Sequence, residues 1–212
     1  MEKPDLIMFD WDGTLVDTFP VIFAANNKVF ESYGMPTFDE ETARKSIRLS
    51  ARDRYPQLFG DQWEQAVERY IAFIEERHIE EMVVFEGAED LLKFLKQKDI
   101  KAGVITNKRQ KIFEKELMHL GWQDYFVTTY GSAQGSHDKP HPQAWKNALE
   151  GLDHKNIWYV GDTGMDVKFG KENGALGVYM THGIGGPHEG TEAGAFKVFH
   201  NLKEFKGVIE SL

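Results

Sequence analysis

Short apolar runs alternate along this chain with segments whose apolar residues have helical spacing. Five such runs end at polar residues, at positions 6–9, 102–105, 125–127, 157–160 and 176–179. Between most of them, apolar side chains recur every three or four residues, as in Leu91, Leu92 and Leu95, and in Ile112, Phe113, Leu117 and Leu120. Buried strands that alternate with helices form largely parallel sheets with helices packed on their faces. The pattern therefore predicts an α/β fold with a three-layer core.

One long stretch interrupts this alternation. From about position 16 to position 82 no convincing strand pattern occurs, and the apolar residues follow helical spacing. Four of them, from Trp63 to Ile74, lie at i, i+4, i+7 and i+11. We therefore predict an inserted helical domain with two hinge connections. The predicted domains are a core of residues 1–15 and 84–212 and a helical cap of residues 16–83.

Charge and composition exclude several classes of protein. The 212 residues include 25 Lys and Arg against 34 Asp and Glu, which gives a net charge of −9. Because nucleic-acid binding needs a basic face, this balance argues against a nucleic-acid partner. The sequence has no cysteine, which excludes disulfides, a thiolate nucleophile and cysteine-ligated zinc.

The N-terminal apolar run is short. Only four apolar residues, at positions 6–9, come before Asp10, too few for the core of a signal peptide or for a membrane span. We therefore expect a cytoplasmic protein without a membrane partner. The sequence leaves the oligomeric state open.

Glycine is concentrated in the C-terminal part of the chain. Half of the 20 glycines lie between Gly161 and Gly194. Because glycine favours turns, we expect this region to be rich in loops, with a mobile loop at positions 183–187.

Polar residues follow the predicted strands. Ligands of open α/β sheets bind at the carboxyl ends of the strands, so these residues should face a common crevice. They are Asp10, Asp12, Thr106, Asn107, Lys139, Asp162 and Asp166. Four clustered carboxylates are costly unless a cation lies among them, and a set of oxygen ligands suits Mg²⁺ best. The sequence therefore predicts a Mg²⁺ site at this edge of the sheet.

Two of these aspartates suit phosphoryl transfer. Asp10, on a strand end beside Mg²⁺, would attack a phosphorus atom and form an aspartyl-phosphate. Asp12, two residues later, would protonate the leaving oxygen and then take a proton from water. The Thr106 hydroxyl and the Lys139 ammonium would hold phosphate oxygens and offset developing charge.

The fourth predicted strand contributes two further aspartates. Asp162 would complete the metal site, and Asp166, on an expected helix, would orient Lys139 or a metal-bound water from behind the ligands. Each residue type also has an ordinary structural role, because Asp and Gly are common in turns, Thr and Asn cap helices, and loop lysines are usually solvated. The functional interpretation depends on their shared order and strand context.

Four segments resemble the motifs of the haloacid dehalogenase superfamily. The string FDWDGTLVD at positions 9–17 is similar to the first motif, DxDGTLxD. Residues 106–107 (TN) match the second motif, residues 139–140 (KP) the third, and residues 161–166 (GDTGMD) the fourth. All four occur in family order and span nearly the whole chain. A short helical cap between the first two motifs resembles the subgroup that includes phosphoglycolate phosphatases.

The resemblance implies a Rossmann-like parallel sheet with an inserted cap that excludes water during phosphoryl transfer. It implies a Mg²⁺-dependent phosphatase that acts on a small phosphate ester, phosphoglycolate-like, with Asp10 as the nucleophile and Asp12 as the acid/base. Mg²⁺ would be held by Asp10, the Asp12 carbonyl and Asp162. The phosphate-binding residues would be Thr106, Asn107 and Lys139.

Other activities of the superfamily remain alternatives to different degrees. Dehalogenases lack the second aspartate and phosphonate-cleaving relatives do not keep an acid/base there, so Asp12 argues against both. Hexose-phosphate mutases keep both aspartates, which leaves a sugar-phosphate mutase or phosphotransferase open. A phosphate-binding regulatory module with little turnover is a third possibility, against which the intact Asp10, Asp12, Lys139 and Asp162 argue.

Basic residues gather in one segment of the predicted cap. Five lie within eleven positions, namely Arg44, Lys45, Arg48, Arg52 and Arg54. If the segment is one helix, glutamates at positions 40–41 pair at i, i+4 with the first two, which leaves Arg48 and Arg52 unmatched by local sequence. We hypothesise that Arg48 or Arg52 binds a second negative group of the substrate, such as a carboxylate. A solvated arginine face is the alternative.

Overall fold

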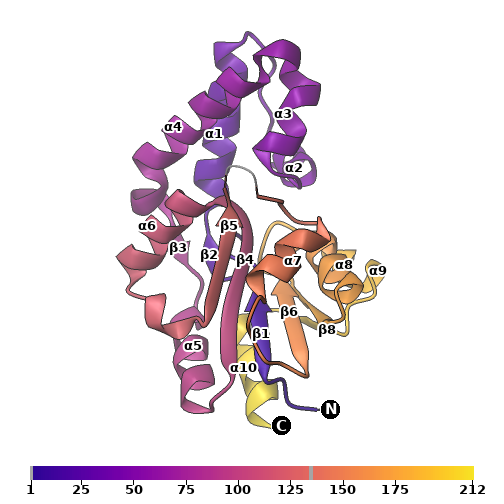
Figure 1. Cartoon of the computed structure of the whole chain (residues 1–212). Helices are drawn as coiled ribbons and strands as arrows, with labels where there is room; N and C mark the ends of the chain where they lie inside the picture. Colours follow the sequence, from indigo (N-terminus) through magenta and orange to yellow (C-terminus); the bar gives the residue numbers. More distant parts are fainter. Residues whose placement is uncertain (1, 134–135) are drawn as a thin grey trace. The chain divides into compact units, whose positions relative to one another are not determined.

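The computed structural model describes residues 2–133 and 136–212 (Figure 1). The chain divides into two compact units. One, here called the core unit, comprises Met1–Asp17 and Val84–Leu212, and the other, the cap unit, comprises Thr18–Val83. Within the described ranges, no helix combines the length and the apolar character that crossing a membrane would require.

The core unit is built on a six-stranded sheet with the order β5-β4-β1-β6-β7-β8. Its strands are β1 (Leu6–Phe9), β4 (Lys101–Arg109), β5 (Thr128–Ser132), β6 (Ile157–Gly161), β7 (Leu176–Met180) and β8 (Lys197–Phe199). All neighbouring strands pair in parallel. Strand β1 lies between β4 and β6, so the strand order reverses beside it, and ligands of such sheets bind at that point.

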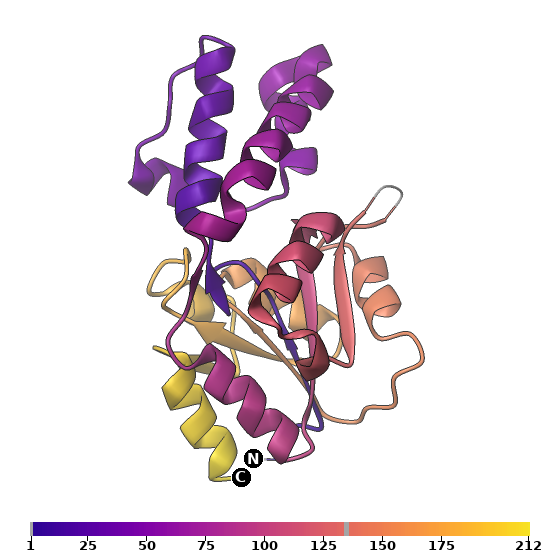
Figure 2. The ribbon, with the colours of Figure 1, turned by 90° about the vertical axis from the view of Figure 1, so that its left-hand side faces the viewer.

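Helices cover both faces of this sheet. They are α5 (Ala88–Gln97), α6 (Gln110–Leu120), α7 (Pro142–Ala148), α8 (Gly164–Glu172), α9 (Glu189–Glu192) and α10 (Leu202–Glu210). On one face, Leu6, Met8 and Tyr159 form a buried cluster with α7 and α8. On the other, Phe9 packs edge-on against Phe205 of α10, which lies beside α5 (Figure 2). The alternation of neighbouring side chains along β1 thus produces three layers, and the predicted fold class is confirmed.

The strand predicted at positions 125–127 is wrong. Gln123–Tyr125 forms a 3-10 turn, and β5 begins only at Thr128. The apolar character of this run has a different cause, because the Phe126 ring packs edge-on against Trp11, with centroids 6.5 Å apart. These aromatic residues were predicted as a strand because packing and strand formation leave the same apolar pattern.

Three short strands were not predicted. Strand β8 has only three residues, two of them exposed, and lies at the edge of the sheet. Strands β2 (Val16–Asp17) and β3 (Val83–Val84) form a separate two-stranded sheet. The expectation of no strand from position 16 to position 82 is therefore wrong at β2. Elements of two or three residues are too short to produce a recognisable alternation.

The cap unit is helical, as predicted. Its elements are α1 (Phe19–Ser32), α2 (Glu40–Ser46), α3 (Ala51–Phe59), a 3-10 turn η1 (Gly60–Gln62) and α4 (Trp63–Glu81). Residues of α1, α3 and α4 build its apolar centre, which contains Val29, Phe30, Tyr55, Phe59, Ala66 and Val67. The spacing from Trp63 to Ile74 lies within α4.

The basic segment of the cap unit is not one helix. Arg48 lies between α2 and α3, and Arg52 lies in the first turn of α3. A new helix starts here because Ser50 caps α3, its hydroxyl accepting a hydrogen bond from Asp53 N at 3.3 Å. The two predicted ion pairs within α2 do form, with N–O distances of 2.8 and 2.6 Å. Arg48 and Arg52 both have interaction partners, so the expectation that they are unmatched along a continuous helix does not hold.

Candidate active site

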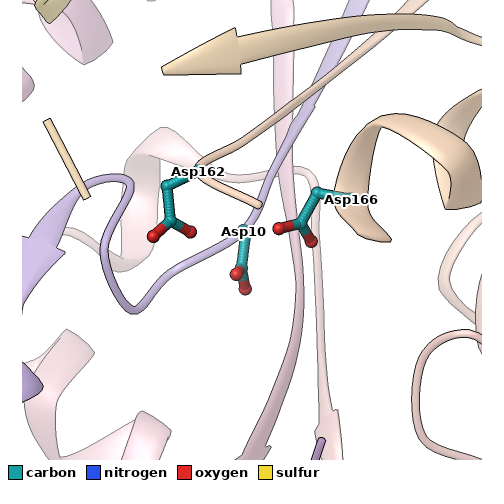
Figure 3. A group of neighbouring side chains, drawn as sticks. All are labelled: Asp10, Asp162 and Asp166. Atoms are coloured by element: carbon teal, nitrogen blue, oxygen red, sulfur yellow. The ribbon is translucent and has the colours of Figure 1, made fainter. Parts of the chain in front are cut away.

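The carboxyl ends of the central strands bring three aspartates together. Asp10 directly follows β1, Asp162 directly follows β6, and Asp166 lies in the first turn of α8. Their side chains lie next to one another (Figure 3), and one carboxylate oxygen from each falls within 4.8 Å of the other two. This group could hold a metal ion, and it is formed by residues that the topology of a parallel sheet places at one edge.

Asp10 is held in a defined orientation. Its Oδ1 accepts a hydrogen bond from the backbone N–H of Trp11 at 2.7 Å and lies 2.9 Å from Lys139 Nζ. Asp10 is only 9% exposed. Burial raises the pKa of Asp10 to about 7, against the opposing effect of Lys139, and the charges of Asp166 and Asp12 raise it further. A metal cation beside this carboxylate would favour its ionised form.

Lys139 is a buried positive charge inside this acidic group. Besides contacting Asp10, its Nζ donates hydrogen bonds to Asp166 Oδ1 at 2.8 Å and to Tyr159 OH at 3.0 Å. The Tyr159 hydroxyl in turn donates to the carbonyl of Ile105 at 3.1 Å. Burial alone would lower the pKa of Lys139, but the carboxylates of Asp10 and Asp166 raise it well above its usual value. Lys139 therefore stays protonated at neutral pH.

Asn107 fixes the backbone of Lys139. Its Nδ2 donates to the Lys139 carbonyl at 2.9 Å, and its Oδ1 accepts from the Lys139 N–H at 2.7 Å. Thr106 is buried, and its Oγ1 accepts a hydrogen bond from Lys108 N at 3.1 Å. Both residues lie within the last part of β4 rather than after it, at an irregularity in the pairing with β5. The structure thus joins the predicted second and third motifs through Asn107.

Asp162 is enclosed by a loop that sequence reasoning did not connect with the site. Its Oδ2 accepts a hydrogen bond from Ile184 N at 2.7 Å. A Cβ added at Gly183 would lie 2.1 Å from the same oxygen, and one added at Gly13 would lie 2.2 Å from it. Burial raises the pKa of Asp162 well above its usual range, and nearby carboxylates add to this effect. A side chain at either glycine would therefore collide with the Asp162 carboxylate.

Asp166 has a structural role as well as a place in the acidic group. Its Oδ2 accepts a hydrogen bond from Thr163 N at 3.2 Å, and Thr163 Oγ1 accepts one from Asp166 N at 3.3 Å. This reciprocal capping box begins α8. Because its other oxygen contacts Lys139, Asp166 couples the start of the helix to the position of that lysine.

Asp12 lies in a second set of buried charges, which was not predicted. Its Oδ1 is 2.6 Å from Lys108 Nζ. Lys108 Nζ also lies 2.8 Å from both carboxylate oxygens of Glu116 on α6, and Glu116 Oε2 accepts a hydrogen bond from Trp11 Nε1 at 2.7 Å. The Glu116 side chain is 0% exposed and that of Lys108 is 6% exposed. Burial would lower the pKa of Lys108, but the charges of Asp12 and Glu116 raise it.

The core unit thus contains seven of the nine predicted site residues. Arg48 and Arg52 belong to the cap unit. The seven are Asp10, Asp12, Thr106, Asn107, Lys139, Asp162 and Asp166.

A family comparison shows what kind of protein has this arrangement. Residues 7–178 match the family model described as haloacid dehalogenase-like hydrolase. The chain belongs to this family. The resemblance drawn from the four motifs is therefore confirmed, and the protein is a hydrolase of the haloacid dehalogenase-like family.

Individual relatives of this hydrolase extend over most of its length. A phosphoglycolate phosphatase of Neisseria meningitidis is 29% identical over 196 residues, which cover 87% of this chain and 83% of the relative. The pyrophosphatase PpaX of Bacillus mycoides is 26% identical over 181 residues, 84% of each chain. A solved haloacid dehalogenase-like family protein of Streptococcus pneumoniae superposes with a TM-score of 0.84 at 25% identity, covering 96% of this chain and 97% of that one.

The acidic group of this haloacid dehalogenase-like hydrolase fits a divalent cation. Asp10, Asp162 and Asp166 offer oxygen ligands, which are the donors that Mg²⁺ prefers. Two of the three carboxyl groups have raised pKa values because they are buried near other carboxylates. A cation at this position would favour the ionised carboxylates and so oppose the rise in pKa that burial and the neighbouring carboxylates cause.

Proposed function

We propose that this hydrolase is a Mg²⁺-dependent phosphatase that acts on a small phosphorylated metabolite through an aspartyl-phosphate on Asp10. One observation carries the proposal. The buried Asp10 carboxylate lies 2.9 Å from Lys139 Nζ and shares its strand-end position with the carboxylates of Asp162 and Asp166. The residues proposed as nucleophile, phosphate-binding cation and metal ligand are thus adjacent. The names of the phosphoglycolate phosphatase and pyrophosphatase relatives support phosphate chemistry.

The metal site would use residues at the ends of β1 and β6. Mg²⁺ would be held by Asp10, the backbone carbonyl of Asp12 and Asp162, and it would supply positive charge against the phosphoryl oxygens. Asp166 would act from behind these ligands, since one of its oxygens contacts Lys139 at 2.8 Å and the other caps α8.

The chain's own side chains would carry both chemical steps. In the first, a carboxylate oxygen of Asp10 attacks phosphorus, the bond from phosphorus to the leaving oxygen breaks, and Asp12 gives that oxygen a proton. In the second, water attacks the phosphorus of the aspartyl-phosphate and Asp12 takes a proton from that water. The bond between phosphorus and the Asp10 oxygen breaks, which releases phosphate and restores the Asp10 carboxylate. Thr106 and Lys139 would hold the phosphate oxygens throughout.

Asn107 would support this chemistry through Lys139. Its amide bonds to both the N–H and the carbonyl of Lys139, which favours a positioning role. Direct phosphate binding by Asn107 stays a prediction from the sequence. The cytoplasmic location also stays a prediction.

The cap would select the substrate. We propose residues 16–83 as the cap domain and residues 1–15 and 84–212 as the catalytic domain, with Arg48 or Arg52 binding a second negative group. The Neisseria meningitidis relative is named for phosphoglycolate, a compound that carries a carboxylate besides its phosphate. Such a carboxylate is the kind of second negative group that an arginine would bind.

These cap arginines have a direct test. Arg48→Ala or Arg52→Ala should raise KM for a carboxylated phosphate ester about 10-fold or more, because a charge-assisted hydrogen bond contributes about 1.5–3 kcal/mol. Arg77→Ala, which breaks an ion pair with Glu81 within α4, is the matched control and should leave KM unchanged. Unchanged KM values in both Arg48→Ala and Arg52→Ala would refute the role.

The decisive experiment for the proposed function is phosphate release from a panel of phosphorylated metabolites, pyrophosphate and an aryl phosphate, in Mg²⁺ or EDTA. We expect Mg²⁺-dependent release that is abolished in Asp10→Asn and retained in Asp124→Asn, a change at an exposed aspartate. No release by folded, metal-bound wild type would reject the phosphatase. Phosphoryl transfer to a sugar hydroxyl in preference to water would favour the mutase alternative.

A further inference from the structure

The buried residues Lys108 and Glu116 lie next to Asp12, the predicted acid/base. Neither takes part in the proposed chemical steps. Lys108 Nζ lies 2.6 Å from Asp12 Oδ1 and 2.8 Å from each carboxylate oxygen of Glu116. The Glu116 side chain is inaccessible to solvent. A buried glutamate is costly unless its partners satisfy it, so its contacts define a fixed arrangement.

Glu116 is tied to the loop of Asp12 by a second route. It accepts a hydrogen bond from Trp11 Nε1 at 2.7 Å, and Trp11 is the residue between Asp10 and Asp12. The Trp11 ring packs edge-on against Phe113 of α6, with centroids 4.9 Å apart. The side chains of Trp11 and Asp12 are thus both connected to Glu116 of α6, the first directly and the second through Lys108.

We propose that Lys108, fixed by Glu116, is a positioning residue that holds the Asp12 carboxylate in the orientation needed for proton transfer to the leaving oxygen. This inference rests on the proposed function, because it assigns to Lys108 an effect on the acid/base step of that reaction. The position of Lys108 in β4, two residues after Thr106, brings its side chain to the carboxyl end of the sheet.

The geometry distinguishes this role from phosphate binding. Lys108 Nζ contacts two carboxylates, Asp12 and Glu116, whereas Lys139 contacts the predicted nucleophile Asp10. A residue that acts through Asp12 should matter most when the leaving group needs a proton. A residue that binds the phosphoryl group should matter equally for every ester.

The test compares two substrates of the wild-type enzyme. One is an alkyl phosphate that the wild type hydrolyses in the metabolite panel, and the other is 4-nitrophenyl phosphate, whose leaving group needs little protonation. We expect Lys108→Met to lower kcat/KM for the alkyl ester about 100-fold, within the range of general acid catalysis, and for the aryl ester less than about 10-fold. Lys108→Arg should recover part of the loss. Lys111→Met, at an exposed lysine on α6, should change neither value.

A second variant keeps the test valid if Lys108→Met leaves Glu116 unpaired and the protein unfolds. The double variant Lys108→Met/Glu116→Gln removes both charges, and the glutamine oxygen still accepts from Trp11. It should show the same preference for the aryl ester. Asp12→Asn provides the reference background, on which Lys108→Met should add no further selective loss if it acts through Asp12.

The outcomes separate this inference from the proposed function. Equal losses for both esters, no loss for either, or a full additional selective loss on the Asp12→Asn background would overturn the positioning role of Lys108. Failure of wild type to hydrolyse either ester, or full activity of Asp10→Asn, would instead overturn the phosphatase itself and the inference with it.

Discussion

Asp10 and Asp12 are only two residues apart, yet each contacts a different buried lysine, and each lysine also contacts a second, buried acid. Asp10 faces Lys139, which also binds Asp166, whereas the partners of Asp12 are Lys108 and, through it, Glu116. The first set contains two of the three carboxylates that could hold a metal, and Asp162 is the third. The second is closed by α6 and an aromatic side chain.

The comparison shows how one strand end can support two kinds of chemistry. A lysine inside the acidic group supplies charge next to the proposed nucleophile. The other lysine contacts Asp12 and is held by a glutamate without solvent access. The Asp12 side chain is also the more accessible of the two aspartates, 23% against 13% exposed. We therefore expect damage to the two sets to have different kinetic signatures.

The largest effect should come from Lys139→Met. The variant removes the positive charge next to Asp10, and kcat should fall about 10²- to 10³-fold, as for loss of a group that stabilises transition-state charge. The loss should be similar for alkyl and aryl esters, measured by steady-state phosphate release. If Lys139→Met instead kept much more activity on the aryl ester than on the alkyl ester, as expected of Lys108→Met, the two lysines would not have different kinetic roles.

The next effect concerns stability on the Asp12 side. Glu116→Ala would leave Lys108 with one acidic partner fewer and Trp11 without its acceptor, so the free energy of unfolding should fall by about 3–5 kcal/mol. Glu114→Ala, at an exposed position of the same helix, should change it by no more than about 0.5 kcal/mol. Urea unfolding measures both. Equal, small changes would show that the Glu116 contacts do not stabilise the fold.

A smaller effect is expected at the loop beside Asp162. Gly183→Ala places a Cβ within 2.1 Å of Asp162 Oδ2, so the carboxylate must move. Affinity for Mg²⁺, measured by calorimetry, should fall about 10-fold, as for other changes in groups that orient metal ligands. Gly186→Ala, in the same loop, meets its nearest side-chain atom only at 3.8 Å and serves as the control. Unchanged affinity in Gly183→Ala would argue against Asp162 as a ligand.

A further effect is a pH dependence of the metal-free protein. Because burial raises the pKa of Asp10 to about 7, the folded protein holds this proton more tightly than the unfolded chain. The associated stability is fully present below the ordinary pKa near 3.8 and is lost as the pH rises through about 7.

Wild type in EDTA should therefore lose stability relative to Asp10→Asn between about pH 4 and about pH 8, and Mg²⁺ should reduce the difference. Urea unfolding at several pH values would show it. A gap between the two proteins that stays constant with pH would mean that Asp10 is not the group that titrates.

The sequence predicts the Asp10 side of the site far better than the Asp12 side. Parallel strands end at one edge, so Asp10 and Asp162 could be placed together from the order of apolar runs alone. Lys139 could be placed at the same edge, but it follows its apolar run only at a distance, so the sequence did not indicate that it contacts both Asp10 and Asp166. The fold was predictable for the same reason, apart from β5, where aromatic packing imitated a strand, and the shortest strands.

The Asp12 side depends on contacts between residues about a hundred positions apart. Trp11 and Glu116 meet only once α6 is packed on the sheet, and no local spacing encodes this. One signal was present, because Glu116 interrupts the apolar positions Ile112, Phe113 and Leu117 of an amphipathic helix. An acid at such a position is buried, and a buried acid requires a partner.

The central claim, covalent phosphoryl transfer to Asp10, is tested most directly by acid-quenched single-turnover reactions with an aryl phosphate, analysed by peptide mass spectrometry. The account predicts one phosphoryl group on the peptide that contains Asp10, formed only with Mg²⁺, and no turnover by Asp10→Asn. Phosphate release by Asp10→Asn at a rate near that of wild type, or a phosphoryl group on a different residue, would contradict it.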